Sequence, residues 1–249
     1  MLTVYSCNVN GIRAAVRKGF LGWLEQTQPD ILCLQETRCI PEELPPELRT
    51  PEGYVTYWEQ SSRKGYSGVA LFSRKAPIDV RAVTVEGAEE GTGGRVLSAE
   101  YDAFQLVNVY VPSRENTKRW PQKQTFLLNL LTCIRGLSLQ GKPVIVCGDF
   151  NIAHQPLMDI LPPQGRKRHV SLLAAETRWV DDLLACGFAD AFRRHLPEAA
   201  AYTWKQPNPT WRLDYIFVNE GLCPLITGAG VHTDVQFSDH CSVSVTFEM

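Results

Sequence analysis

The chain has 249 residues, 44% hydrophobic and 21% charged, so it contains enough apolar material for a large core and enough charge for solubility. No apolar run approaches the ~20 residues that a membrane span requires, and residues 1–10 lack the features of a secretory signal, so we expect a cytoplasmic protein. The net charge of −2 argues against a uniformly basic nucleic-acid binder, although the carboxylates of a metal site would offset basic residues elsewhere.

Short β-rich runs bounded by Gly, Pro, Asn, Asp or Ser recur along the chain and predict strands. In chain order these strands are Leu2–Cys7, Ile31–Gln35, Val55–Tyr57, Gly68–Ser73, Ala82–Val85, Leu97–Tyr101, Phe104–Tyr110, Pro143–Gly148, Leu213–Val218, Gly228–Thr233 and Ser242–Phe247. Apolar residues at three- and four-residue spacing predict helices over Lys18–Thr27, Lys123–Gly136 and Arg178–Ala185, and Gly187 is placed to end the last of them.

No low-complexity linker or change in composition divides the chain, so we expect residues 1–249 to form a single domain with a surface loop over Pro156–Gly165. The segments VYSCNVNG and VIVCGDFN both run an apolar strand into Asn or Asp, a weak echo that fits two similar halves. Many strands with interspersed helices predict an α/β fold in which two sheets pack face to face and helices cover them.

The eight cysteines do not follow a disulfide or zinc pattern. Cys7, Cys33 and Cys147 lie inside apolar strands, where a free thiol behaves as a small hydrophobic group. No CxxC motif occurs, so we expect free thiols in a reducing compartment.

Polar or acidic residues recur where predicted strands end. They are Asn8 and Asn10, Gln35 and Glu36, Asn108 and Tyr110, Asp149 and Asn151, and Asp239 and His240; Asp214 is expected inside a strand. Each site alone is more often a turn or a helix cap, but turn formation does not explain the whole set. Strand ends on one side of a sheet converge, and oxygen-rich side chains with a single histidine favour Mg²⁺ or Mn²⁺ over zinc.

These motifs resemble the exonuclease III and abasic-site endonuclease family of the endonuclease/exonuclease/phosphatase superfamily. The resemblance runs from CNVNGIRA through DILCLQETR, KGYSGVALFSR, NVYVP, VCGDFNIAH, ETRWVDDLL and YTW to WRLDYIFV and SDHCSV, nearly the whole chain. It implies a four-layer α/β/β/α sandwich of two packed mixed sheets flanked by helices. It also implies a monomeric Mg²⁺-dependent enzyme, with Mn²⁺ able to substitute, that cleaves double-stranded DNA 5′ to abasic sites and has 3′→5′ exonuclease and 3′-phosphatase activity.

The resemblance also implies roles for individual residues. Catalysis would involve Tyr110 at the phosphate, Asp149 on the attacking water, Asn151 in the transition state, and His240 oriented by Asp214. The implied metal ligands are Glu36 with Asn8, Asp239, Asp149, Asn151 and His240. The implied DNA contacts are Asn10, Arg13, Lys64, Tyr66, Trp204, Trp211 and Leu213.

Three features depart from the family pattern. Asn10 stands where some members carry an aspartate, and the loop KQPNPT between YTW and WRLDY is short. NVYVP is followed by a segment without the usual glycine. We expect the KQPNPT loop to face the DNA and to act as a wedge in it. A shorter loop should make that wedge less complete and favour exonuclease over abasic-site activity.

Two alternatives stay open at this point. QET, GDFN and SDH are shared across the superfamily, so a cousin acting on tyrosyl-DNA, lipid or nucleotide phosphates fits the same motifs. A catalytically dead binding module on this fold is the second alternative, and the presence of Glu36, Asp149 and His240 disfavours it. Basic clusters at residues 13–18, 63–64, 166–169 and 193–195 would support DNA binding only if the fold gathers them on one rim.

Overall fold

The structure is a computed structural model, and it describes residues 1–85, 93–113, 120–154, 159, 170–205 and 211–249. In these residues the strands form two six-stranded mixed sheets. The first sheet has the order β11 (Ile226–His232), β12 (Ser242–Phe247), β1 (Leu2–Asn8), β2 (Ile31–Gln35), β4 (Val69–Ser73) and β3 (Val55–Glu59). The second has the order β5 (Asp79–Ala82), β6 (Val96–Glu100), β7 (Gln105–Tyr110), β8 (Val144–Asp149), β10 (Asp214–Asn219) and β9 (Phe188–Asp190).

The two sheets share one pattern of strand directions. Each has one parallel pair at its centre, β1 with β2 and β7 with β8, and the other neighbours are antiparallel. The expectation of two similar halves is therefore confirmed. The echo of VYSCNVNG in VIVCGDFN, however, pairs the wrong strands, because β1 occupies the position of β7 and β2 that of β8.

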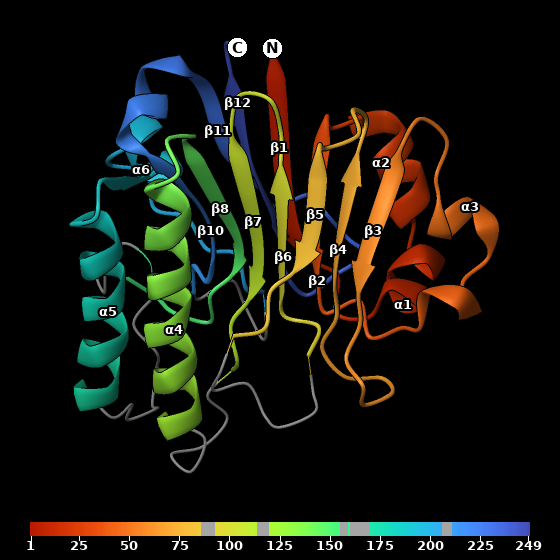
Figure 1. The fold of residues 1–249 in the computed structure, drawn as a ribbon. Helices are drawn as coiled ribbons and strands as arrows, with labels where there is room; N and C mark the ends of the chain where they lie inside the picture. The colour runs from red at the N-terminus through yellow and green to blue at the C-terminus, as the bar shows by residue number, and fades with distance from the viewer. Residues whose placement is uncertain (86–92, 114–119, 155–158, 160–169, 206–210) are drawn as a thin grey trace.

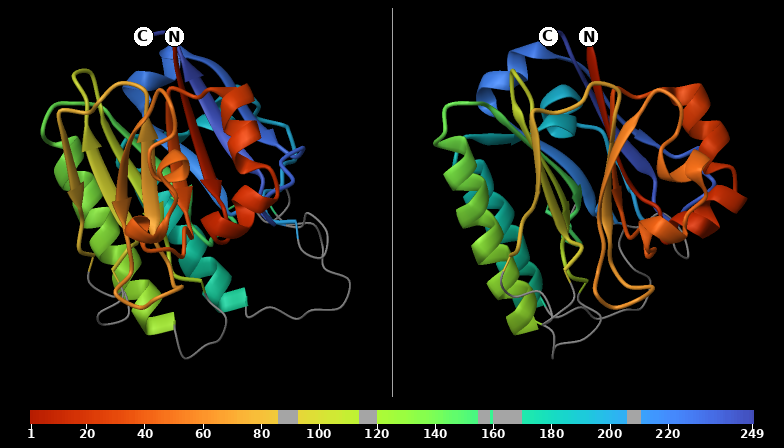
Figure 2. Two further views of the ribbon diagram at one scale, coloured as in Figure 1. Left: turned by 90° about the vertical axis from the view of Figure 1, so that its right-hand side faces the viewer. Right: turned by 45° about the vertical axis from the view of Figure 1, so that its right-hand side comes forward.

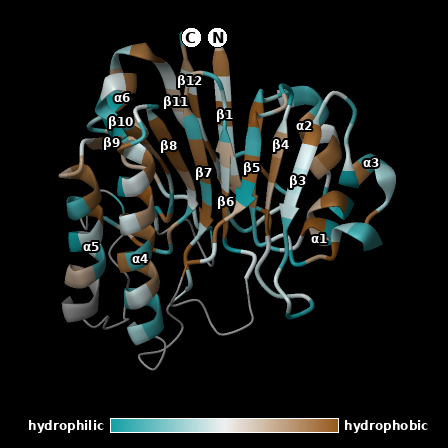
Figure 3. Ribbon diagram, viewed as in Figure 1, coloured by the Kyte–Doolittle hydropathy of each residue, from teal (hydrophilic) through white to brown (hydrophobic). Residues whose placement is uncertain are grey.

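Three apolar clusters fill the spaces between four layers. One lies between the sheets and contains Val4, Cys33, Leu106 and Cys147 among its buried residues. A second lies between the β5–β10 sheet and the helices α4 (Trp120–Ser138) and α5 (Val170–Leu184). A third joins the other sheet to α1 (Ile12–Arg17), α2 (Phe20–Thr27) and α3 (Pro46–Arg49). Figures 2 and 3 show helices on both outer faces and apolar residues along the strands, as predicted for an α/β/β/α sandwich.

Several predicted boundaries are wrong for local reasons. The helix expected over Lys18–Thr27 begins two residues later, as α2, because Gly19 adopts a left-handed conformation before it, and the prediction missed the preceding helix α1. The strand expected over Ala82–Val85 lies earlier, at Asp79–Ala82, and α5 begins well before Arg178. The prediction missed β9, α6 (Ala191–His195) and the short 3₁₀ helices Pro41–Glu43 and Glu220–Leu225, which are too short to show a period.

The polar residues named above meet at one edge of the sandwich. β1, β2, β7 and β8 all end at the edge opposite the chain termini (Figure 1). Asp214 is the first residue of β10 rather than an interior one, and it is paired in register with Asp149 because β10 runs antiparallel to β8. The predicted loop at 156–165 lies outside the described residues, except for Asp159.

All eight cysteines carry free thiols, as predicted. Burial raises the pKa of Cys7 and of Cys33, so these thiols stay neutral within their sheet. Among the described residues, no helix combines the length and apolar character needed to cross a membrane.

Gly148 generates the first prediction, because it lies directly before Asp149 with φ near 146° and a Cβ there would stand 1.8 Å from the Val109 carbonyl oxygen. Gly148→Ala should cost at least ~3 kcal/mol of unfolding free energy. Gly136→Ala is the matched control, since its Cβ meets nothing within 4 Å on α4, and it should add ~0.5–1 kcal/mol. Urea unfolding of both variants measures this. A Gly148→Ala protein as stable as wild type would contradict the close approach.

Candidate functional site

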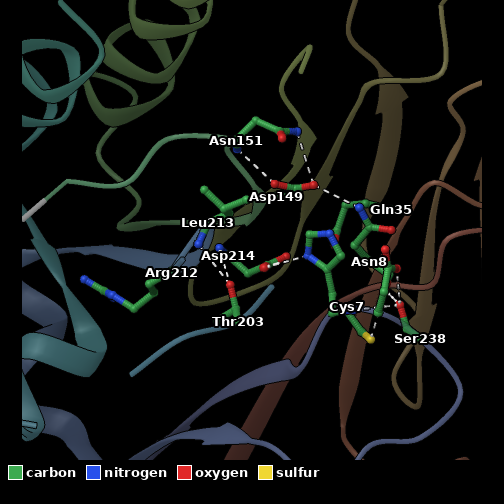
Figure 4. A network of polar contacts seen from close by, with 12 residues as sticks. Cys7, Asn8, Gln35, Asp149, Asn151, Thr203, Arg212, Leu213, Asp214 and Ser238 are labelled. Atoms are coloured by element: carbon green, nitrogen blue, oxygen red, sulfur yellow. Dashed lines mark hydrogen bonds and ion pairs between the residues drawn. The ribbon is translucent and has the colours of Figure 1, made fainter. Parts of the chain in front are cut away.

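One buried amide joins the two sheets at the functional edge. Asn8 ends β1 with no exposed surface, and its Nδ2 donates to Glu36 Oε1 and to Asp149 Oδ2, each at 2.9 Å. Glu36 follows β2 and Asp149 ends β8, so a single side chain links carboxylates from both sheets (Figure 4 shows the Asn8–Asp149 bond). Arg38 forms an ion pair with the second oxygen of Glu36.

The serine–aspartate–histidine segment before β12 closes one side of this center. Ser238 Oγ donates to the Asn8 carbonyl at 2.6 Å and accepts from the His240 backbone N–H. Asn10 Nδ2 donates to Asp239 Oδ1 at 2.9 Å. An aspartate in place of Asn10 would set two carboxylates side by side, which explains in physical terms why an amide suits this position.

His240 and Asp214 form a buried pair. His240 Nδ1 lies 2.9 Å from Asp214 Oδ2, and Thr203 Oγ1 accepts the backbone N–H groups of Leu213 and Asp214. Burial alone would lower the pKa of His240, but the charge and hydrogen bond of Asp214, with Asp149 and Asp239, raise it to about 10. His240 is therefore an imidazolium at neutral pH.

Tyr110 and Asn151 complete the center from the second sheet. Tyr110 Oη donates to Glu36 Oε1 at 2.7 Å. Burial, followed by the charges of Glu36 and Asp149, raises the pKa of Tyr110 well above its usual value, so its hydroxyl keeps its proton. Asn151 donates to Asp149 twice, from its backbone N–H at 2.9 Å and from Nδ2 at 3.2 Å.

The backbone at these positions is left-handed. Asn10, Glu36 and Asn151 have φ between 45° and 52°, a region that asparagine tolerates and glutamate adopts rarely. Glu36 is held there by hydrogen bonds from Gly11 N to its carbonyl and from Asn8 and Tyr110 to its carboxylate. Unusual backbone conformations cluster at functional sites, where neighbouring contacts maintain them.

The site has the charge balance and donors that suit a hard divalent cation. Burial raises the pKa of Asp149 to about 7, and the charges of Asp214 and Glu36 add to this more than His240 offsets it. Ligand atoms of Asp149, Asp214 and His240 lie within 4.8 Å of one another. Asp214 Oδ1 is buried without a hydrogen-bond partner. Excess carboxylate charge and an unsatisfied buried oxygen favour a cation.

The structure reassigns two residues that the strand-end pattern had grouped with the site. Gln35 Nε2 donates to Asn108 Oδ1 at 2.7 Å, and Asn108 Nδ2 donates to the carbonyls of Leu34 and Ala70 in the opposite sheet. Both side chains are buried. They form a polar bridge between the sheets and do not belong to the carboxylate center.

Arg13, Lys64 and Tyr66 form a group that we call the rim, and Arg95 links Tyr66 to Tyr110 of the center. Arg13 and Lys64 both form ion pairs with Glu43, and the guanidinium groups of Arg63 and Arg95 lie 5.1 and 5.5 Å from the centre of the Tyr66 ring. The fold thus gathers the basic groups of residues 13 and 63–64 on one side. Arg193 instead forms an ion pair with the buried Asp159, and residues 166–169 lie outside the described part of the chain.

Trp204, Trp211 and Leu213 pack with Ala153 in a small apolar cluster. Trp211 is 8% exposed. Trp204 is half-buried, and its backbone forms isolated antiparallel β-bridges with Trp211 and with His240. Trp211 is therefore part of a packed wall near the site, more enclosed than an open aromatic rim. Residues 206–210 of the short loop, and residues 114–119 after NVYVP, lie outside the described residues.

Sequence reasoning missed Arg95, which is 5% exposed and touches the site through Tyr110. Its guanidinium lies over the Tyr110 ring at 4.9 Å, and its Nη1 donates to the Tyr110 carbonyl at 3.2 Å. No sequence signal distinguishes Arg95 from other strand-flanking arginines. The GYSG motif indicated Tyr66, which contacts Arg95, but it did not indicate Arg95 itself.

Comparison with known proteins gives concordant matches over nearly all of the chain. A model described as the endonuclease/exonuclease/phosphatase family matches residues 5–240. An exodeoxyribonuclease of Bacillus subtilis is 37% identical over 98% of this chain and 98% of its own. Two solved structures cover 100% of both chains: a 3′ phosphatase, NExo, from Neisseria bound to a product DNA hairpin (TM-score 0.88, 25% identity) and an AP endonuclease from Archaeoglobus fulgidus (TM-score 0.86, 26% identity).

The raised pKa of Asp149 generates a stability prediction. A carboxyl whose folded pKa is about 7 contributes stability that is fully present below its unfolded pKa near 3.8 and is lost as pH rises through 7. In EDTA at pH 8, Asp149→Asn should therefore be more stable than wild type by on the order of 1 kcal/mol, roughly 2–4 °C in Tm. The difference should shrink toward pH 5. A variant that is less stable than wild type at pH 8 would mean that Asp149 is not electrostatically strained.

Proposed function

The chain belongs to the endonuclease/exonuclease/phosphatase family, and on that premise we propose that it is a Mg²⁺-dependent DNA phosphodiesterase of base-excision repair. It cleaves 5′ to abasic sites and also acts on 3′ ends as an exonuclease and phosphatase. The observation that carries this proposal is the Asn8 amide that holds Glu36 and Asp149 together across the two sheets, facing the His240–Asp214 pair.

Glu36 is the principal ligand of the cation in this proposal. Its side chain is 12% exposed, whereas Asp149 and Asp214 are nearly fully buried, and Asn8 donates to it. Asp239, which is partly buried, would be a further carboxylate ligand. Asp149 and Asn151 would lie next to the ion, and Asp214 of the buried cluster can share it. His240 was expected among the ligands, but as an imidazolium it has no free ring nitrogen for a metal and would contact the phosphate instead. When bound, Mg²⁺ or Mn²⁺ would neutralise the charge that develops on the phosphoryl oxygens.

Asp149 and His240 have different roles in the proposed reaction. Asp149, with a pKa of about 7, is suited to take a proton from the attacking water. His240 is already protonated, so it supports contact with the phosphate rather than the role of base. The water gives one proton to Asp149 while its oxygen bonds to phosphorus and the bond to the 3′-oxygen breaks. The 3′-oxygen leaves as a hydroxyl after taking a proton from solvent.

Tyr110 and Asn151 present hydrogen-bond donors to the same phosphate. Both donors are directed at carboxylate oxygens of the center, Tyr110 at Glu36 and Asn151 at Asp149. A phosphoryl group placed between them would receive these N–H and O–H groups in exchange. Donors fixed before the reaction stabilise developing charge without further reorganisation.

The substrate assignment rests on the rim and on the relatives. Arg13 and Lys64, which share Glu43, and Tyr66 and Asn10 would contact phosphates of the DNA, and Trp204, Trp211 and Leu213 form an apolar wall. An apolar wall suits a sugar that lacks a base, because no base pair opposes its extrusion. The similar proteins named above act as an exodeoxyribonuclease, a 3′ phosphatase and an AP endonuclease.

Metal dependence tests the proposal directly. The wild-type protein should nick a duplex that carries one abasic-site analogue in Mg²⁺ or Mn²⁺, and EDTA should abolish nicking. Glu36→Gln keeps the shape but removes the ligand charge, so it should raise the Mg²⁺ concentration for half-activity by about tenfold or more. Glu47→Gln, an exposed acid on α3, is the control. Full nicking in EDTA, or activity confined to lipid or nucleotide phosphates, would refute the assignment.

The His240–Asp214 pair generates a pH prediction. In wild type His240 stays protonated up to a pH of about 10, so activity that depends on the imidazolium should persist through alkaline pH. Asp214→Asn removes the charge that raises this pKa most, while burial continues to lower it. The variant should lose about 10- to 1000-fold in kcat at pH 8 and recover part of it as the pH falls. An unchanged pH profile would mean that Asp214 does not control the charge of His240.

A further inference from the structure

A lysine–glutamate ion pair lies buried behind the candidate site. Lys123 on α4 has no exposed surface, and the side chain of Glu176 on α5 is 4% exposed. Lys123 Nζ donates to Glu176 Oε1 at 2.8 Å and to the backbone carbonyl of Asn151 at 2.8 Å. Helices α4 and α5 lie side by side on the outer face of the second sheet (Figures 1 and 2).

Helix packing alone does not account for this pair. Removing two charges from water costs several kcal/mol, and replacing a buried ion pair by apolar residues of similar volume is often neutral or stabilising. The surrounding cluster of Phe126, Leu127, Trp179 and Val180 could accommodate such residues. The distinctive feature is the third partner, because the ammonium reaches past Glu176 to the backbone of a residue in the candidate site.

The Asn151 backbone needs such a partner. Its φ of 51° is left-handed, its N–H is held by Asp149 Oδ1, and its carbonyl is held by Lys123. These two bonds fix the peptide units on both sides of Asn151. They thereby fix the direction of its side chain, whose Nδ2 lies 3.2 Å from Asp149 Oδ2 and 3.0 Å from the Val111 carbonyl.

We propose that Lys123, neutralised by Glu176, is a positioning residue that holds Asn151 in the left-handed conformation required for its amide to reach the reacting phosphate. This inference rests on the proposed function, since it assigns Lys123 a role in the same reaction. Loss of the ammonium leaves the carbonyl of Asn151 without this donor and lets the turn relax. The chemistry then suffers although the DNA-binding rim is untouched.

The test is Lys123→Met, which keeps the length of the side chain without its charge. On an abasic duplex in Mg²⁺, kcat should fall about 10- to 100-fold while the Kd for the duplex changes less than about twofold. Glu176→Gln keeps an acceptor for Lys123 and should lose less. Leu130→Ala, a buried residue on the same helix, is the control and should lower Tm without lowering kcat of the folded protein.

A double-mutant cycle separates positioning from general destabilisation. If Lys123 acts through Asn151, Lys123→Met should change kcat less than about twofold in an Asn151→Ala background. Additive losses, or a Lys123→Met variant that resembles Leu130→Ala, would overturn the inference. Amide hydrogen exchange at residues 149–152 should accelerate in Lys123→Met, and an unchanged rate there would also overturn it. That measurement stands even if wild type cleaves no DNA, an outcome that would refute the proposed function instead.

Discussion

The hydrogen bonds from the Asn8 amide to Glu36 and Asp149 fix the geometry on which the rest of the site depends. One nitrogen can bridge two carboxylates from different sheets only if β1, β2 and β8 end at the same level along one edge of the sandwich. Face-to-face packing of two similarly ordered sheets brings these strand ends to that level. The buried Gln35–Asn108 bridge locks the sheets a short distance away. Burial of Asp149 at this edge, together with repulsion from the acids brought close to it, raises the pKa of Asp149.

Burial raises the pKa of Asp149 but lowers that of His240, and the negative charge of the surrounding acids raises both, with different consequences for each. Asp149 gains a proton readily because it is buried among other carboxylates, whereas His240 retains its proton because the same carboxylates surround it. The carboxyl of Asp149 has a pKa near neutrality and the imidazole of His240 one far above it. Because these pKa values differ, one group can act as a base while the other remains a cationic contact for the phosphate. A bound cation would relieve the repulsion, so metal affinity and proton release are linked.

The sequence predicted the site better than it predicted the elements that support it. Strand ends with polar residues located Asn8, Glu36 and Asp149, because side chains at converging strand ends meet regardless of loop structure. His240 instead precedes β12, and it reaches the same edge because β12 runs antiparallel to β1. The same pattern misassigned Gln35 and Asn108, since it cannot tell a residue facing the edge from one facing the opposite sheet. Short elements such as β9 and α6 carry no measurable period and depend on tertiary contacts that local sequence does not encode.

Lys123 shows where a physical signal in the sequence was present but incomplete. It stands three, four and seven residues before Phe126, Leu127 and Leu130, so it shares the apolar face of α4, and Glu176 similarly precedes Trp179 and Val180 on α5. A charge on a buried helix face requires a partner. Two such charges of opposite sign on separate helices therefore predict an ion pair between the helices. The third partner, the carbonyl of Asn151, cannot be predicted from the sequence in this way, because every residue has a backbone carbonyl and residue type does not show which one accepts the bond. Only the left-handed turn at Asn151 reveals why a buried lysine is useful there.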